Sequence, residues 1–222
     1  ISKLRVLDSS TYKERKLPAL PIGVVGGFQF SPDGQQLALS INTATSPSDV
    51  YVINLKSAEL TRWSQSEVGG LDSTTFIAPS LIRFKSFDGK EIPAFLYKPE
   101  GTGPFPVVIN IHGGPEAQAF PTFSPSIQYM LREMKVAVLV PNVRGSSGYG
   151  KNYLQLDNGF LRKDSVKDIG ALLDWIATQP ALDKDRVGVS GGSYGGYMVL
   201  ASMVDYNNRI RAGIDVVGIS NF

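Results

Sequence analysis

The chain has 222 residues, of which 42% are apolar and 19% are charged, and its net charge is +2. This composition is ordinary for a folded protein of one or two domains, and the scattered Lys and Arg residues do not indicate a nucleic-acid or membrane partner. The chain has no cysteine, which excludes disulfides and thiolate chemistry, and no apolar stretch approaches the roughly 20 residues of a membrane span.

Residues 1–75 contain short strands separated by turn signals, which indicates an all-β unit. The predicted strands are Leu4–Asp8, Phe28–Phe30, Leu37–Ile41, Val50–Leu55 and Leu60–Trp63. A Pro-Asp-Gly turn follows the second strand, and the order of these elements resembles one blade of a β-propeller preceded by the tail of another. A small antiparallel sheet is the alternative interpretation, because roughly one and a half blades cannot close a ring.

From Ser80 onward the pattern changes to that of an α/β domain. Asp88-Gly89 lies between two strand-like segments and predicts a hairpin. The predicted buried strands and helices that follow are Val107–Ile111, Ser126–Met134, Val136–Val140 and Ser165–Ala177. Ser165 and Asp168 resemble a capping box at the start of the last helix. Strands and helices that alternate with short connections predict a mostly parallel sheet.

The segment Val187–Tyr197, VGVSGGSYGGY, contains a G-x-S-x-G motif at a predicted strand-to-helix turn. Such a turn strains the backbone of its central serine, and the residues two positions away must lack side chains, which explains Gly191 and Gly195. The dipole of the following helix would favour negative charge that develops beside the serine. This context predicts that Ser193 is a catalytic nucleophile, with an idle serine in a glycine-rich turn as the alternative.

The sequence His112-Gly113-Gly114-Pro115 directly follows the apolar strand that ends at Ile111. In hydrolases this loop presents a backbone N–H to an oxyanion, and we expect Gly114 and Tyr194 to supply two such donors. His112 is the only histidine of the chain. We expect it to brace the loop through hydrogen bonds rather than to act as the base, because the base histidine of α/β-hydrolases follows the serine.

Three motifs, in this order and spacing, resemble the prolyl oligopeptidase family of serine peptidases. They are HGGP at His112–Pro115, NVRGSSGYG at Asn142–Gly150 and GGSYGGYM at Gly191–Met198. The third motif is most similar to the acylaminoacyl-peptidase-like, or dipeptidyl-peptidase-like, branch. The resemblance covers essentially the whole chain: residues 1–78 are similar to the last part of the family's propeller, and residues 79–222 to the N-terminal part of its hydrolase domain.

The resemblance implies that Ser193 is the nucleophile of an acyl-enzyme mechanism, and that Gly114 and Tyr194 donate N–H groups to the oxyanion. It also implies a substrate pocket for an apolar side chain, lined by Tyr194, Ile219 and Phe222. Core packing is the alternative role for these three apolar side chains.

The chain departs from the family pattern after Ser193, because no triad acid and base are found there. Asp205 and Asp215 follow the serine, but we interpret both as structural. We therefore expect a fragment whose sheet lacks its C-terminal strands and exposes an edge at Ile210–Val217. Arg144, in the second motif, is expected to be a structural ion-pair partner in a loop that organises the site.

The predicted fold is α/β, a partial α/β-hydrolase with a mostly parallel sheet, preceded by the last part of a β-propeller. The predicted activity is that of a serine peptidase on short peptides, of acylaminoacyl-peptidase or oligopeptidase type. A carboxylesterase and an inactive fragment without the triad Asp and His are the alternatives, and this chain alone is expected to be inactive. We expect no cofactor, no metal, a cytoplasmic location and a homo-oligomer, and we expect the missing C-terminal segment or another chain to complete the sheet.

Overall fold

The computed structural model describes residues 2–221. Contacts within the chain divide it into two compact units. The first unit comprises residues 1–78 and 120–125, and the second comprises residues 79–119 and 126–222.

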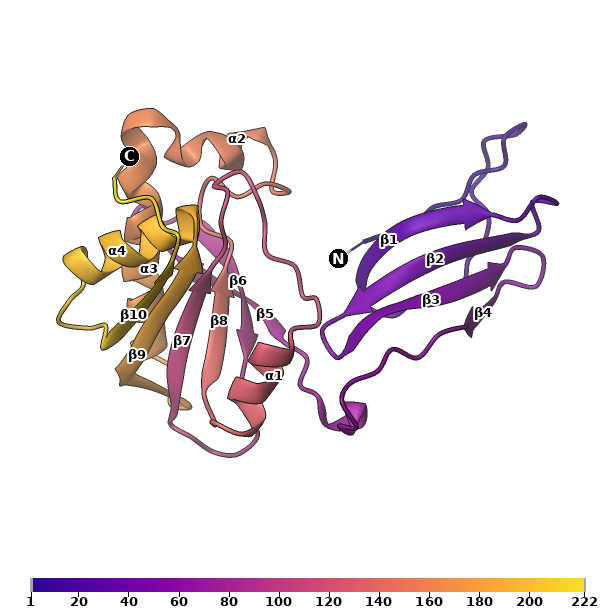
Figure 1. Ribbon diagram of the computed structural model, residues 1–222. Helices are drawn as coiled ribbons and strands as arrows, with labels where there is room; N and C mark the ends of the chain where they lie inside the picture. Colours follow the sequence, from indigo (N-terminus) through magenta and orange to yellow (C-terminus); the bar gives the residue numbers. More distant parts are fainter. Residues whose placement is uncertain (1, 222) are drawn as a thin grey trace. The chain divides into compact units, whose positions relative to one another are not determined.

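The first unit is a four-stranded antiparallel sheet in the order β1-β2-β3-β4 (Figure 1). The strands are β1 (Gly23–Phe30), β2 (Gln36–Thr43), β3 (Ser46–Asn54) and β4 (Glu59–Arg62). Alternate residues of β2 and β3 share one face, as the period of two requires. The core residues on that face are Leu37, Leu39, Ile41, Tyr51 and Ile53. The four strands predicted after Phe28 are therefore confirmed.

A buried carboxylate joins β3 to the chain that leaves β4. Asp49 accepts hydrogen bonds from the Arg62 guanidinium, from Ser64 Oγ at 2.9 Å and from Ser66 Oγ at 3.0 Å. Burial opposes ionisation, but the hydrogen bonds from Ser64, Arg62 and Ser66 outweigh it and lower the pKa of Asp49 to about 2. Asp49 is therefore an ionised structural residue of this sheet.

The strand predicted at Leu4–Asp8 does not form. Leu7 makes only an isolated antiparallel bridge with Glu14. The chain reverses direction at Asp8, whose side-chain Oδ1 accepts the Thr11 N–H at 2.9 Å. This local turn competes with strand extension, which is the usual effect of an Asp side chain on its own backbone.

A segment that is distant in sequence, residues 120–125, packs with the first unit. The Phe123 N–H donates to Asn42 Oδ1 at 2.8 Å, and the ring centroids of Phe123 and Phe76 lie 5.3 Å apart. The sequence did not predict this excursion, because no local pattern shows where a loop finds its partners.

The second unit contains a six-stranded mixed sheet in the order β10-β9-β7-β8-β6-β5 (Figure 1). Its strands are β5 (Ser80–Lys85), β6 (Glu91–Tyr97), β7 (Phe105–Ile111), β8 (Ala137–Pro141), β9 (Leu182–Gly192) and β10 (Ala212–Val216). The strands β7 to β10 run parallel to one another, whereas β6 pairs antiparallel with both of its neighbours, β8 and β5. Within residues 2–221 β10 is an edge strand with all its residues exposed, as expected for Ile210–Val217.

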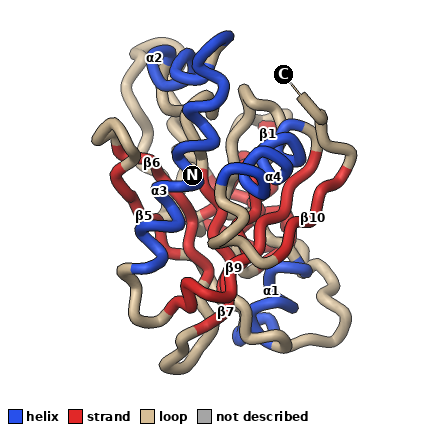
Figure 2. The backbone as a smooth tube through the Cα atoms, turned by 90° about the vertical axis from the view of Figure 1, so that its left-hand side faces the viewer, coloured by secondary structure: helices blue, strands red, loops and turns tan. Residues whose placement is uncertain are grey.

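Helices cover both faces of this sheet. The helices are α1 (Pro125–Arg132), α3 (Arg162–Ala177) and α4 (Tyr194–Asp205), and a short helix, α2 (Lys151–Leu154), precedes α3. In the two backbone views, α3 and α4 lie on one face and α1 lies on the other (Figures 1 and 2). This layering confirms the predicted α/β class. Among residues 2–221, none of the helices combines the length and the apolar character needed to cross a membrane.

The predicted capping box at Ser165 and Asp168 is wrong. The helix α3 begins three residues earlier, at Arg162, so both residues lie inside it and are buried. The Ser165 hydroxyl contacts the Arg162 carbonyl oxygen at 2.7 Å, and the Asp168 carboxylate binds Arg144 instead of the helix backbone. Tertiary hydrogen bonds have replaced the local ones that the spacing predicts.

Candidate active site

Ser193 is exposed and lies between the end of β9 and the start of α4, so the predicted strand–turn–helix context is confirmed. Its backbone has φ 55° and ψ −119°. A positive φ is rare for a residue with a side chain, and such a conformation costs on the order of 1–3 kcal/mol. The strain predicted for the central serine of this turn is therefore present.

Two glycines allow the turn to pack against the end of β7. A Cβ atom on Gly195 would collide with the Ile111 carbonyl oxygen, and a Cβ atom on Gly191 would lie 2.5 Å from the Gly195 carbonyl oxygen. Backbone atoms cannot move aside as a flexible side chain can, so only glycine fits either position. This is the physical reason for the G-x-S-x-G spacing.

The glycine loop, residues 112–119, follows β7 and contains Gly113 and Gly114. It borders the serine. β7 and β9 run parallel, with Ile111 paired to Gly191, so the residues that follow both strands meet at one edge of the sheet. A Cβ atom on Gly113 would lie 3.5 Å from Ser193 Cβ and 4.0 Å from Ser193 Oγ. Gly113 thus lies beside the serine side chain, and the next N–H along the chain is that of Gly114, the predicted donor to an oxyanion.

His112 braces this loop, as predicted. Its Nδ1 lies 2.7 Å from the Gly113 carbonyl oxygen and its Nε2 lies 2.9 Å from Ser146 Oγ. Because a carbonyl oxygen only accepts hydrogen bonds, Nδ1 carries a proton and donates it. This bond fixes the plane of the peptide whose N–H belongs to Gly114. Burial lowers the pKa of the imidazole, which favours its neutral form.

The hydrogen bonds of His112 are made within the loops and not with Ser193. In the described part of the chain, the imidazole forms its hydrogen bonds with Gly113 and Ser146 and none with Ser193.

Within residues 2–221, no group of three or more His, Asp or Glu side chains is placed to hold a metal ion.

A second loop, residues 142–150, holds the glycine loop in place. Asn142 Oδ1 accepts the Ala119 N–H at 2.7 Å, and the Ser147 N–H donates to the Ala117 carbonyl oxygen at 2.8 Å. Together with the contact between Ser146 and His112, these bonds tie the glycine loop at both ends. The expectation that residues 142–150 organise the site is supported by these contacts.

Arg144 is the structural ion-pair partner that the sequence predicts. Its guanidinium is almost fully buried and donates to Asp168 at 2.8 Å and to Asp88 at 3.0 Å. It also lies 4.5 Å from the centroid of the Phe87 ring. Burial opposes ionisation of Asp88, but the Arg144 guanidinium holds the pKa of that carboxyl well below its usual range. This cluster fixes the second loop to the hairpin of β5 and β6.

The backbone N–H and the side chain of Tyr194 lie in different environments. Tyr194 is the first residue of α4, so its backbone N–H lies at the helix N-terminus beside Ser193. Its side chain is fully buried, and the hydroxyl lies 3.1 Å from Asp157 Oδ2 and 2.8 Å from Ser165 Oγ. Burial raises the pKa of the hydroxyl. The backbone suits the predicted role as an oxyanion donor, whereas a buried ring does not face solvent as a pocket wall would.

The other predicted pocket residues lie after β10. The Ser193 N–H donates to the Val216 carbonyl oxygen at 3.0 Å, so this strand ends beside the turn. Ile219 follows three residues later and is 39% exposed. Phe222, the third predicted pocket residue, lies outside the described residues. The role of Ile219 in substrate binding stays a prediction.

Sequence reasoning missed the side chains that surround Tyr194. Asp157 and Arg162 come from a segment that shows no motif, and Ser165 was interpreted only as a helix cap. A buried acidic residue is not distinguishable from a surface one in a single sequence, so no signal could have identified Asp157.

Comparison with known proteins agrees with this geometry. The model of the prolyl oligopeptidase family matches residues 121–222. The uncharacterised peptidase YuxL of Bacillus subtilis is 32% identical over 89% of this chain, and dipeptidyl aminopeptidase BIII of Pseudoxanthomonas mexicana is 28% identical over 82% of it. The matched region spans about 30% of the length of each relative.

Solved structures show the same fold. The acylaminoacyl peptidase of Pyrococcus horikoshii matches 95% of this chain with a TM-score of 0.77 and 26% identity, and the match covers 33% of that protein. A puromycin hydrolase matches 94% of this chain with a TM-score of 0.81 and 24% identity, over 32% of its own length. With the strained serine and the glycine loop in place, these matches show that the chain belongs to the prolyl oligopeptidase family.

Proposed function

We propose that the protein is a serine peptidase of the oligopeptidase or acylaminoacyl-peptidase type, and that this chain carries its nucleophile and oxyanion donors. The observation that carries the proposal is the exposed, strained Ser193 at the start of α4, bordered by Gly113. A serine is held in such a conformation at an energetic cost, which is typical of a nucleophile at a strand-to-helix turn.

In the proposed reaction, Ser193 Oγ attacks the carbonyl carbon of a short peptide and a new C–O bond forms. The carbonyl oxygen becomes an oxyanion that accepts hydrogen bonds from the backbone N–H groups of Gly114 and Tyr194. The C–N bond then breaks, and the proton from Oγ passes through a base to the leaving amine. Water hydrolyses the acyl-enzyme and restores the hydroxyl.

We propose that the base for Ser193 is a histidine other than His112. His112 is the only histidine among the 222 residues, and its ring is held by Gly113 and Ser146. A histidine base would therefore belong to another segment of the polypeptide or to another chain.

We also propose that the first unit is a blade of a β-propeller. The support is its four-stranded antiparallel meander, which is the make-up of a propeller blade. Large apolar side chains of this sheet are exposed, among them Phe28, Phe30 and Trp63, as a blade requires where a neighbouring blade would cover it. An experimental structure of the protein expressed from its complete coding sequence would contradict this if the strands had no neighbouring blade.

Hydrolysis assays test the proposed activity. The protein from its complete coding sequence should cleave acetylated amino-acid anilides or dipeptidyl anilides, and Ser193→Ala should abolish the cleavage. Ser190→Ala, on the preceding strand, provides the matched control and should keep the activity. Cleavage of simple carboxylic esters with no cleavage of any peptide anilide would favour a carboxylesterase, and cleavage that survives Ser193→Ala would refute the proposal.

A further inference from the structure

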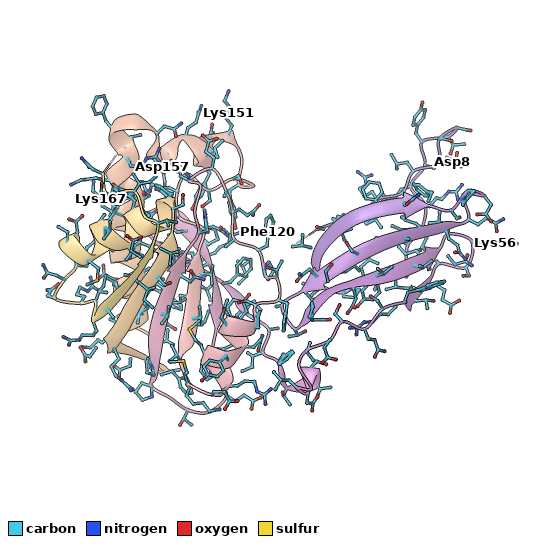
Figure 3. All side chains as sticks on the ribbon, in the orientation of Figure 1. Asp8, Lys56, Phe120, Lys151, Asp157 and Lys167 are labelled. Atoms are coloured by element: carbon cyan, nitrogen blue, oxygen red, sulfur yellow. The ribbon has the colours of Figure 1, made fainter. Side chains whose placement is uncertain are left out.

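Asp157 is a buried carboxylate that belongs to none of the predicted motifs. It ends the 3₁₀ turn Gln155–Asp157, between α2 and α3, and none of its surface is exposed. Its Oδ2 accepts hydrogen bonds from Arg162 Nη1 and from the Tyr194 hydroxyl, the latter at 3.1 Å. Figure 3 labels Asp157 among the helical segments of the second unit.

The same carboxyl group packs against the loop that supports the glycine loop. A Cβ atom on Gly145 would collide with both carboxylate oxygens of Asp157. The neighbouring residue, Ser146, contacts His112, which in turn fixes the peptide of Gly113 and Gly114. Asp157 therefore touches Tyr194 and the loop that supports the glycine loop.

The environment of Asp157 does not suit a residue kept for stability. In the described part of the chain its second oxygen, Oδ1, is buried without a hydrogen-bond partner. Burying an oxygen of a carboxylate without a partner is costly. Only Oδ2 has partners, and these are Arg162 and Tyr194.

The Tyr194 side chain is held on several sides. The Arg162 guanidinium lies 5.3 Å from the centroid of its ring, and its hydroxyl contacts Asp157 and Ser165. Tyr194 directly follows Ser193, whose strained backbone persists only if its surroundings determine it. Holding the tyrosine ring therefore limits how far the serine and the Tyr194 N–H can move.

We propose that Asp157 is a positioning residue, which anchors the Tyr194 hydroxyl and thereby keeps Ser193 and the Tyr194 N–H in the geometry that acyl transfer requires. The inference rests on the proposed function of Ser193. Asp157 is buried and does not touch the substrate, so its removal should lower kcat and leave KM within about twofold.

The test is a double-mutant cycle in the protein expressed from its complete coding sequence. Asp157→Ala should lower kcat roughly 10- to 100-fold, which is less than the 10²–10³-fold cost of losing an oxyanion donor. Tyr194→Phe removes only the hydroxyl and should lower kcat to a similar extent. Both changes remove the same hydrogen bond, between Asp157 and the Tyr194 hydroxyl. The kcat of the double variant should therefore be no lower than that of the more impaired single variant.

Two further variants separate positioning from a general structural effect. Asp157→Asn keeps an oxygen that can accept the Tyr194 hydroxyl, so it should recover most of the kcat that Asp157→Ala loses. Asp164→Ala removes a carboxylate from the first turn of α3 that pairs with Lys167, and it should keep full activity.

Full kcat in Asp157→Ala, losses confined to KM, or additive losses in the double variant would overturn the inference. If Asp157→Ala does not fold, full kcat in Tyr194→Phe would overturn it equally. An unmodified protein that cleaves no peptide anilide and is not labelled at Ser193 by an active-site-directed phosphonate would instead refute the proposed function.

Discussion

Replacing Ser193 with glycine should stabilise the second unit, because the strained backbone of this residue would be relieved. A residue with a side chain at φ 55° and ψ −119° carries strain of about 1–3 kcal/mol, which glycine does not. Glycine loses about 0.4–1 kcal/mol through the greater entropy of the unfolded chain. The midpoints of these two ranges give a net gain in the free energy of unfolding of about 1.3 kcal/mol, or a few degrees in Tm.

Ser193→Ala is the matched control for this prediction. Alanine keeps the Cβ atom and hence the strain, and it removes only an exposed hydroxyl, so its stability should stay within about 0.5 kcal/mol of the unmodified chain. Trp175 lies on α3 and packs against the core of the second unit, whereas Trp63 lies in the first unit. In a Trp63→Phe background of these 222 residues, which hold two tryptophans, tryptophan fluorescence during denaturant unfolding therefore reports the second unit.

The difference in stability between Ser193→Gly and Ser193→Ala tests whether the backbone at residue 193 is strained. In an unstrained position, glycine is less stable than alanine by roughly 0.5–1 kcal/mol. At residue 193 we expect the opposite order, with the glycine variant more stable than the alanine variant. A Ser193→Gly variant that is no more stable than Ser193→Ala would show that the turn is not strained.

Three further predictions concern the loops and the first unit. Gly113→Ala places a methyl group 3.2 Å from the Gly192 carbonyl oxygen, and the displaced loop should lower kcat roughly 10-fold with little change in KM. His112→Ala should lower kcat and His112→Asn should recover part of it, because the Asn amide can donate to the Gly113 carbonyl in place of Nδ1; equal losses in both would contradict the bracing role. Asp49 has a folded-state pKa of about 2, below its unfolded value near 3.9, so its stabilisation is present above pH 4 and lost as the pH falls to 2. Asp49→Asn should remove on the order of 1–2 kcal/mol of that acid dependence from the unfolding of the first unit.

The parts of the fold that the sequence predicts are those with a local cause. The apolar runs at Val107–Ile111 and Val136–Val140 form β7 and β8, because strands buried on both faces need continuous apolar side chains. The glycines around Ser193 were interpretable because a tight turn imposes their spacing. Local geometry therefore predicted both the central strands and the strained turn that holds Ser193.

The features that the sequence did not predict depend on contacts between distant residues. Asp168 has the spacing of a cap, yet its carboxylate binds Arg144 across the fold. Asp157 accepts a hydrogen bond from Tyr194, which lies 37 positions later in the sequence. The partners of a buried polar side chain are set by tertiary packing, which no local pattern contains.

The most direct test of the central claim is the site at which an active-site-directed phosphonate reacts. The protein expressed from its complete coding sequence is incubated with the phosphonate, digested and examined by mass spectrometry. We expect a single phosphonylated residue, Ser193, in the unmodified protein and no label in Ser193→Ala. A label on another serine, or no label in a protein that cleaves peptide anilides, would contradict the assignment of Ser193 as the nucleophile.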